Sequence, residues 1–168
     1  MGKIRRKNLK IGSKLIEGGT VYRVFKIKNS RKNGEADRII YYKPYFKNDI
    51  NRTITCSIPE SSIEETLIRK PISKEEAEEV LKKLASRTRR VPLDVNRAKT
   101  EMVLNDIYIT VKIVKRYWRE KLVNSEGFSK TKKNILEMAL DKVVEELAIV
   151  NNTSLGSAEE KVLAALGN

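Results

Sequence analysis

The hydrophobic pattern of the chain changes its period near residue 70, and this change constrains the fold more than any other feature. Before residue 70, short runs are β-branched and aromatic or alternate apolar with polar side chains, and both patterns are typical of strands. After residue 70, apolar side chains recur every three or four positions, which predicts helices. We therefore predict an α+β chain with a β domain over residues 1–70 and an all-α domain over residues 71–168.

The first domain reads as a series of short strands separated by glycine- and asparagine-containing turns. The predicted strands lie at residues 14–16, 21–28, 38–42 and 53–58. Pro44 cannot donate to a strand ladder, so we expect it at an edge or a strand end. Cys56 alternates with Ile54 and Ile58, and we expect these three side chains on one buried face. Four or five short strands with tight turns favour a small barrel or a strongly bent sheet.

The second domain carries helix start signals at regular intervals. Ser73 and Glu76 form a capping box, and Ser157 and Glu160 predict another before the last helix. Together with caps expected at Asp94, at Asn105-Asp106 and at Ser129, the pattern predicts helices over about 73–85, 94–104, 106–122, from 129, and 157–166. Short links between about five helices favour a compact bundle. The apolar line predicted for the third helix is Ile107, Val111, Val114, Trp118 and Leu122, which places Trp118 in the core.

Composition excludes several classes of function. The sequence has no histidine and one cysteine, which rules out imidazole-based triads, histidine-ligated zinc and internal disulfides. It has no glycine-rich phosphate loop and no clustered aspartate motif. We therefore predict no catalytic residues, no metal, no cofactor and no small-molecule substrate, and expect a protein that is not an enzyme. The absence of disulfides, of a signal sequence and of a long apolar run favours a cytoplasmic protein without a membrane contact.

The formal net charge is +13, and it is concentrated in two blocks. Residues 1–70 carry 17 basic and 7 acidic side chains, and residues 82–133 carry 15 and 5. Such blocks favour a polyanionic partner, and the second block is the candidate for DNA. The alternative is a solvated surface that only keeps the protein soluble. The DNA-binding candidates are Arg87, Arg89, Arg90, Arg97, Lys112, Lys115, Arg116, Arg119, Lys130, Lys132 and Lys133.

Two local patterns support that assignment. Lys112, Lys115, Arg116 and Arg119 share one face of the third predicted helix, because steps of three and four residues return to the same face. Lysines crowd the first turn of the fourth helix, where the helix dipole favours anions, and a bound phosphate would relieve their repulsion.

The order of these parts resembles the CarD/CdnL family of bacterial transcription regulators. Residues 9–16 resemble the opening motif of the family, residues 57–59 its Val-Pro strand end, and Phe128-Ser129 the start of its late helix. The first domain is also similar to the polymerase-interacting domain of the transcription-repair coupling factor. The chain departs from the family pattern at Ser13, where the family has aspartate, and at Gly18-Gly19, where it has His-Gly. Val91-Pro92-Leu93 stands where many members carry a tryptophan.

The resemblance implies a Tudor-like barrel that docks on the β subunit of RNA polymerase, and a helical domain that contacts promoter DNA at the edge of the melted bubble. In the family a tryptophan wedges into the minor groove. Here Val91, Pro92 or Leu93 is the candidate wedge, since smaller apolar side chains can also open a base step. For docking, we expect the strand at residues 21–28 to accept a partner strand at an exposed edge. The polymerase-binding candidates are Tyr22, Arg23, Lys26, Arg38 and Tyr42, and the alternative is that they are ordinary outward residues.

The sequence therefore predicts a non-catalytic transcription regulator that bridges RNA polymerase and promoter DNA and modulates the stability of the initiation complex. Little sequence preference is expected, because no helix carries the side chains that read base edges. The alternative is an RNA- or ribosome-associated module in which the basic barrel grips nucleic acid. A membrane-surface protein is disfavoured, because the basic helix lacks an exposed apolar face.

Overall fold

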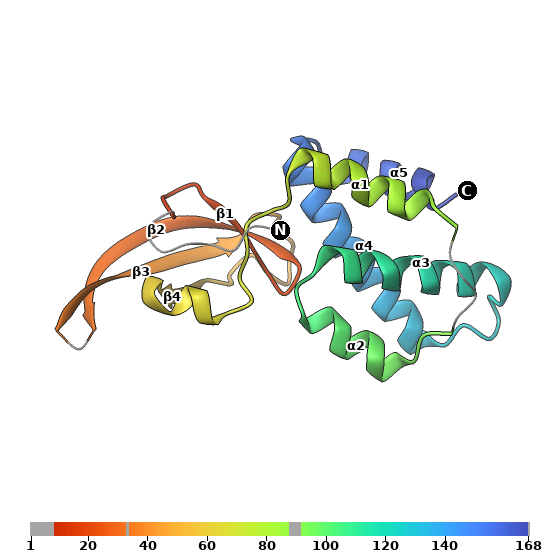
Figure 1. The fold of residues 1–168 in the computed structure, drawn as a ribbon, viewed down its shortest axis with the longest axis horizontal. Helices are drawn as coiled ribbons and strands as arrows, with labels where there is room; N and C mark the ends of the chain where they lie inside the picture. Colours follow the sequence, from red (N-terminus) through yellow and green to blue (C-terminus); the bar gives the residue numbers. More distant parts are fainter. Residues whose placement is uncertain (1–8, 33, 88–91, 168) are drawn as a thin grey trace. The chain divides into compact units, whose positions relative to one another are not determined.

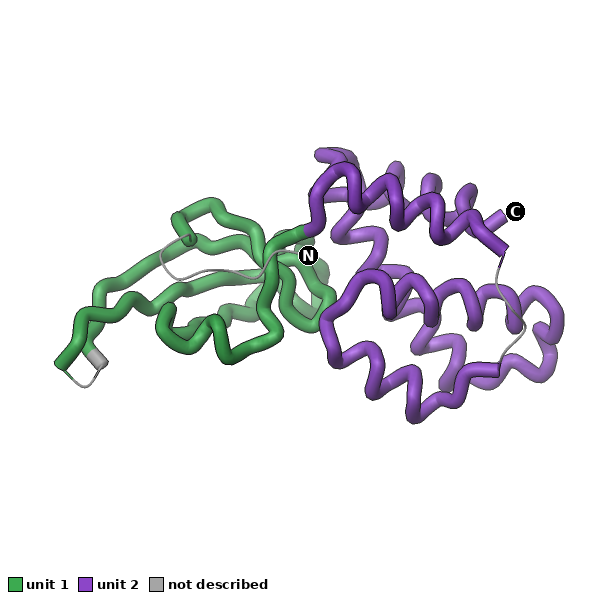
Figure 2. Tube along the Cα trace, viewed as in Figure 1, with its two compact units in different colours: residues 1–71 green, residues 72–168 purple. Residues whose placement is uncertain are grey.

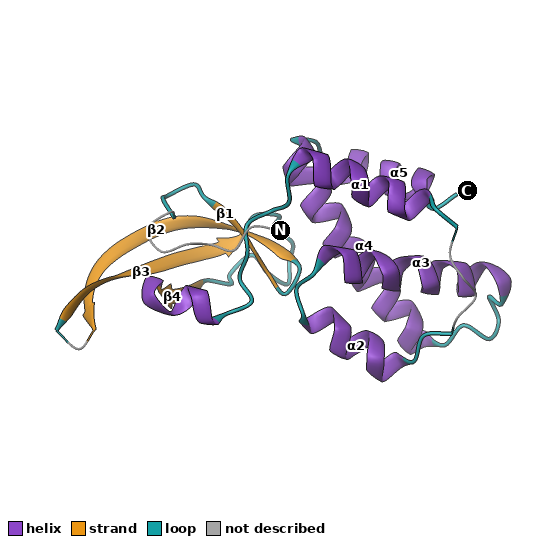
Figure 3. Ribbon diagram, viewed as in Figure 1, coloured by secondary structure: helices purple, strands orange, loops and turns teal. Residues whose placement is uncertain are grey.

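The computed structural model describes residues 9–32, 34–87 and 92–167, and it has the α+β composition predicted from the sequence. The chain divides into two compact units, Met1–Pro71 and Ile72–Asn168 (Figure 2). The first unit holds the strands and one short 3₁₀ helix, and the second unit holds the α-helices (Figure 3). In the described ranges, no helix has both the length and the apolar character that crossing a membrane requires.

The first unit is a four-stranded antiparallel sheet in the order β1-β2-β3-β4 (Figure 1). Its strands are β1 (Lys14–Glu17), β2 (Thr20–Lys32), β3 (Glu35–Pro44) and β4 (Cys56–Pro59). The sheet is open, so the structure does not show the closed barrel that we expected. The free side of β1 is instead occupied by one bridge to the segment after η1 (Glu60–Glu65), in which Ile16 N–H donates to the Arg69 carbonyl over 2.8 Å.

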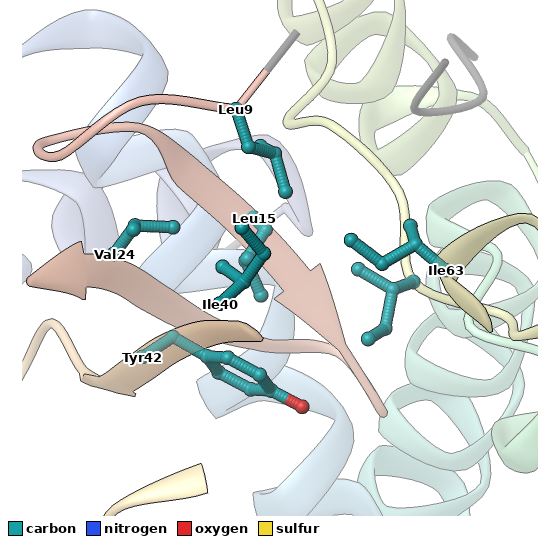
Figure 4. Close-up of a cluster of buried hydrophobic side chains, with 7 residues drawn as sticks. Leu9, Leu15, Val24, Ile40, Tyr42 and Ile63 are labelled. Atoms are coloured by element: carbon teal, nitrogen blue, oxygen red, sulfur yellow. The ribbon is translucent and has the colours of Figure 1, made fainter. Parts of the chain in front are cut away.

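A β-bulge at Phe25 keeps Val24 and Ile27 of β2 on the same, inner side of the sheet. The register pairs Val24 with Tyr42 and then Ile27 with Ile40, so that both apolar side chains of β2 face the same side. The core on that side contains Leu9, Leu15, Val24, Ile40, Tyr42, Ile63 and Ile68 (Figure 4). This cluster is the hydrophobic core of the sheet unit.

Three strand predictions need correction at their ends, and one of them is β3, which was predicted over 38–42 and extends over Glu35–Pro44. The strand predicted over 53–58 begins only at Cys56, because Ile54 N–H donates to the Asn51 carbonyl in a turn and the Ile54 side chain is 42% exposed. Cys56 and Ile58 do pack against the core. β2 extends to Lys32 rather than ending at residue 28, and its last residue pairs with Glu35. Pro44 is the last residue of β3, a strand end as predicted.

The described part of the second unit contains five α-helices. They are α1 (Lys74–Ala85), α2 (Val95–Val103), α3 (Ile107–Val123), α4 (Lys130–Asn151) and α5 (Leu155–Ala165). The predicted caps of the first four helices, Ser73, Asp94, Asp106 and Ser129, all accept backbone N–H groups at the helix starts. The last helix was predicted to begin at Ser157, which was wrong: Ser154 is its N-cap and accepts from Ser157 N–H.

The α4 helix is the centre of the bundle, since it packs against each of the other four helices. The apolar face of α3 differs from the predicted line. Tyr117 is fully buried and packs edge-on against Phe128 with ring centroids 6.0 Å apart, whereas Trp118 is half-buried and Leu122 is 65% exposed. The buried face of α3 is therefore rotated toward Tyr117, whose ring is contacted by Lys132 of α4. Trp118 is therefore less buried than predicted, although its ring nitrogen is fully buried.

Candidate nucleic-acid interface

The C-terminal half of α1 is fastened to α3 by polar contacts. Tyr108 of α3 donates its hydroxyl hydrogen to Glu79 of α1 over 3.0 Å, and Lys83 Nζ lies 3.1 Å from the same carboxylate. Lys83 also sits over the Tyr108 ring, with Nζ 4.1 Å from the ring centroid. Two turns further along α3, Lys115 Nζ donates to the Lys83 carbonyl over 2.5 Å and to Ser86 Oγ over 2.7 Å. The end of α1 therefore lies against the middle of α3.

The pKa shifts of the residues in this contact are consistent with the arrangement. Burial lowers the pKa of Lys115, whose ammonium group lies between the two helices. The pKa of Tyr108 is raised to about 12, mainly by burial and to a smaller extent by the hydrogen bond to Glu79. The hydrogen bonds from Lys83 and Tyr108 in turn lower the pKa of Glu79. Glu79 is therefore engaged by Lys83 and Tyr108 at this contact.

Beside this contact the two helices present a surface of basic side chains, which we call the basic face. Lys112 follows Tyr108 by one turn on α3, Arg116 and Arg119 follow further along the same side, and Arg87 lies just past the end of α1. Arg87, Lys112 and Arg116 have no carboxylate partner among the described residues. The basic face consists of Lys83, Arg87, Lys112, Lys115, Arg116 and Arg119.

Two of the predicted DNA-binding residues outside the basic face, Arg97 and Lys132, are engaged in ion pairs. Arg97 forms an ion pair with Glu101 at 2.7 Å along α2. Lys132, in the first turn of α4, forms an ion pair with Glu120 at 2.5 Å and lies over the Tyr117 ring. The lysine repulsion that we expected a phosphate to relieve is thus reduced by a carboxylate of α3. Lys130 and Lys133 are exposed.

Most of the predicted wedge is not accessible or is not described. Arg89, Arg90 and Val91 lie outside the described residues. Leu93 is 2% exposed, and its carbonyl accepts the Tyr117 hydroxyl over 3.3 Å, so its side chain belongs to the bundle core. This observation removes Leu93 as a wedge candidate. Pro92 is exposed.

The polymerase-binding candidates do not form one surface. Tyr42 is 3% exposed, its hydroxyl donates to Glu17, and Tyr22 packs edge-on against its ring at 5.4 Å. Both tyrosines therefore serve the core, and Tyr42 is withdrawn as a contact residue. Arg38 forms an ion pair with Glu60 and donates to the Leu9 carbonyl, which ties three segments of the sheet unit together. Arg23 and Lys26 are exposed.

The strand at residues 21–28, which we expected to accept a partner strand, has a free edge over only part of its length. Over residues 20–23, β2 lies between β1 and β3, and Val24 exchanges hydrogen bonds with Gly12 and Ser13. Beyond Val24, no described strand pairs with this side of β2. An open edge is therefore available in the long β2–β3 hairpin rather than over residues 21–24.

Sequence reasoning missed Lys83 as a member of the basic face and Tyr108 as the residue of α3 that binds Glu79 and Lys83 of α1. Glu79 and Lys83 are four residues apart, a spacing that predicts an ion pair along a helix. Tyr108 gave no such signal, because its partners belong to another helix and the pairing of α1 with α3 is a tertiary contact. Comparisons with family models and with curated proteins give no match for this chain. The resemblance to the CarD/CdnL family therefore rests on the motifs quoted above.

Proposed function

We propose that this chain is a non-catalytic transcription regulator that binds promoter DNA through the basic face and RNA polymerase through its sheet unit. The observation that carries the DNA-binding half is the set of free cations, Arg87, Lys112 and Arg116, beside the fastened contact between α1 and α3. The proposed binding to RNA polymerase is supported by the resemblance of residues 9–70 to the first domain of the CarD/CdnL family and by the open edge of the β2–β3 hairpin.

The basic face suits the phosphate backbone of a duplex rather than its bases. Its members are lysines and arginines, and no asparagine or glutamine stands among them to read adenine in the major groove. Lys115 and Lys83 fasten the two helices, so the free cations are presented from a rigid pair of elements. Binding should therefore depend strongly on salt and weakly on sequence.

The DNA-binding half is tested by fluorescence anisotropy with the full chain and two labelled duplexes of unrelated sequence, over a series of salt concentrations. The triple variant Arg87→Ala/Lys112→Ala/Arg116→Ala is expected to bind both duplexes more weakly by the same factor. Because each phosphate contact contributes about 0.9 to the slope of log K against log salt, the slope should become shallower by roughly 2 to 3.

The matched control removes the same charge from positions outside the basic face. Lys74, Lys99 and Lys161 are exposed and lie outside the basic face, so the variant Lys74→Ala/Lys99→Ala/Lys161→Ala should keep the salt slope of the unchanged protein. Equal losses in the two triple variants would show that only net charge matters and would remove the basic face as the site.

The polymerase-binding half is tested by retention of purified RNA polymerase on the immobilised full chain. The basic-face triple variant serves as control, because its substitutions lie in the other unit and should leave retention unchanged. No retention by the unchanged protein would overturn this half of the proposal. Retention that disappears with the basic-face variant would show that the helical unit holds the polymerase instead.

A further inference from the structure

Beyond the buried pair Ile16 and Val21, the side of the sheet opposite the hydrophobic core carries cations and aromatic rings. We call it the outer face of the sheet. The strand register places its members beside one another: Lys14 lies opposite Arg23, Arg23 opposite Lys43, and Lys26 opposite Tyr41. These positions alternate with core residues such as Leu15 and Ile40, so their side chains leave the sheet on the other side. The outer face consists of Lys14, Arg23, Phe25, Lys26, Lys28, Tyr41, Lys43 and Ser57, with Tyr45 at its margin.

Each aromatic ring of the outer face has a lysine over it. Lys26 and Lys28 lie over the Tyr41 ring, with Nζ 5.7 and 5.9 Å from its centroid. Lys43 lies over Phe25 at 4.9 Å, and Lys14 over Tyr45 at 5.5 Å. The Phe25 and Tyr41 rings meet edge-on at 6.4 Å. Flexible lysines therefore occupy the ring faces of the free protein, where another flat group could replace them.

The cations of the outer face do not stabilise the folded sheet. Lys14, Arg23 and Lys43 lie directly opposite one another on three neighbouring strands, an arrangement of like charges that destabilises a sheet. Among the described residues, no carboxylate pairs with these three cations or with Lys26 and Lys28. A polyanion bound across the strands would remove this repulsion.

We propose that the outer face of the sheet binds single-stranded RNA. Unpaired bases stack on Tyr41 and Phe25 in place of the lysine side chains, and the displaced lysines reach the phosphates on either side of each base. A duplex does not fit this arrangement, because its bases are already paired and stacked. An acidic peptide would satisfy the cations but has no flat bases to stack on both rings.

The choice of RNA over single-stranded DNA comes from Ser57. This exposed serine lies opposite Tyr41 in the register between β3 and β4. Its hydroxyl group can exchange a hydrogen bond with the 2′-hydroxyl of a ribose whose base is stacked on Tyr41, and DNA lacks that group. The inference concerns a different surface from the DNA-binding basic face and does not depend on the proposed transcription function.

The test is fluorescence anisotropy of the full chain with a labelled oligouridine of about 12 nucleotides, within the range that one small β domain covers. Lys26→Ala/Lys28→Ala is expected to weaken binding about tenfold, since it removes two phosphate contacts. Lys99→Ala/Lys161→Ala removes the same charge from exposed positions of the helical unit and should change binding less than about twofold.

Stacking is tested separately from charge. Tyr41→Leu should weaken binding about tenfold, whereas Tyr41→Phe, which keeps the ring, should stay within about twofold. Phe25→Leu provides a second measurement of the same kind if Tyr41→Leu lowers the melting temperature. Ser57→Ala should reduce the preference for oligouridine over oligodeoxythymidine of the same length.

Four results would overturn the proposal. They are no binding of oligouridine by the unchanged protein, equal losses in the two double-lysine variants, equal affinities of the leucine and phenylalanine variants at residue 41, and equal or tighter binding of oligodeoxythymidine. Tight binding of a polyglutamate peptide that is insensitive to Tyr41→Leu would identify an acidic protein as the partner and would also overturn it. The basic-face triple variant should leave oligouridine binding unchanged.

Discussion

The ammonium group of Lys115 lies 2.7 Å from the hydroxyl oxygen of Ser86, at the C-terminal end of a different helix. It also donates to the Lys83 carbonyl, one of the last carbonyls of α1. The last four carbonyls of a helix have no partner within the helix, and the helix dipole favours a cation beside them. Lys115 therefore acts as a structural cap of α1, although the sequence placed it with the DNA-binding residues.

Replacing Lys115 by alanine should consequently lower stability. Because two hydrogen bonds to a partly exposed cation are lost, we expect Lys115→Ala to reduce the free energy of unfolding by about 1 kcal/mol. Lys112→Ala, on the solvent side of the same helix, should change it by less than about 0.5 kcal/mol. Urea denaturation followed by circular dichroism measures both, and equal effects would contradict a capping role for Lys115.

Substitution of Glu146 should lower the stability of the helical unit more than substitution at most other positions. Its side chain is 0% exposed and accepts a hydrogen bond from Ile72 N–H at 3.0 Å, which holds the segment before α1 against α4. Glu146→Ala leaves that buried N–H without its acceptor and creates a cavity, so we expect a loss of about 2–3 kcal/mol. Glu146→Gln keeps an acceptor oxygen and should lose less than half as much. Thermal and urea denaturation check this order, and a reversed order would contradict it.

The local signals in the sequence predicted most elements, because caps and turns depend on neighbouring residues. Ser73, Asp94, Asp106 and Ser129 all cap helices as predicted, since a short oxygen-bearing side chain at a helix start needs only the next turn to act. The start of the last helix was misplaced, because Ser154 and Ser157 both carry a hydroxyl group suited to the cap. Structure alone distinguishes them.

The parts that failed depend on tertiary packing. The sequence could not show that α3 would bury Tyr117 more deeply than Trp118, since the two neighbouring residues are both large and aromatic. The sequence also could not show whether the sheet closes into a barrel, because strand patterns do not specify whether the first and last strands pair. The role of Arg38 could not be predicted for the same reason. From the sequence it resembled a surface cation, and only the fold places Glu60 beside it.

Arg38 should therefore be a stability residue of the sheet unit. Its guanidinium group pairs with the buried Glu60 carboxylate, which raises the pKa of Arg38, and it also donates to the Leu9 carbonyl. Arg38→Ala leaves Glu60 buried without this partner, and we expect a loss of about 2–3 kcal/mol. Arg23→Ala removes an exposed cation of β2 that lies opposite Lys14 and Lys43, so it should lose no stability. Urea denaturation followed by tyrosine fluorescence makes the comparison, and equal losses would show that the ion pair contributes nothing.

The reactivity of Cys56 should report on the inner side of the sheet. Burial, and then the negative charge of Glu17, raises the pKa of its thiol, and Glu17 also accepts the Tyr42 hydroxyl. The reactive form is the thiolate, so alkylation by iodoacetamide should begin at a higher pH in the folded protein than in urea. Because the neutral thiol is favoured in the folded state, its contribution to stability is complete below the pKa of the unfolded thiol and is lost as the pH rises through the folded value.

Glu17→Gln separates the two causes of this shift. Removing the charge should move the onset of alkylation to lower pH, while burial should keep it above the onset of the unfolded chain. Glu65→Gln, at an exposed position of the same unit, is the matched control and should leave the onset unchanged. The rate of iodoacetamide labelling as a function of pH, followed by mass spectrometry, gives all three onsets. An onset that is the same in the unchanged protein and in Glu17→Gln would show that burial alone controls the thiol.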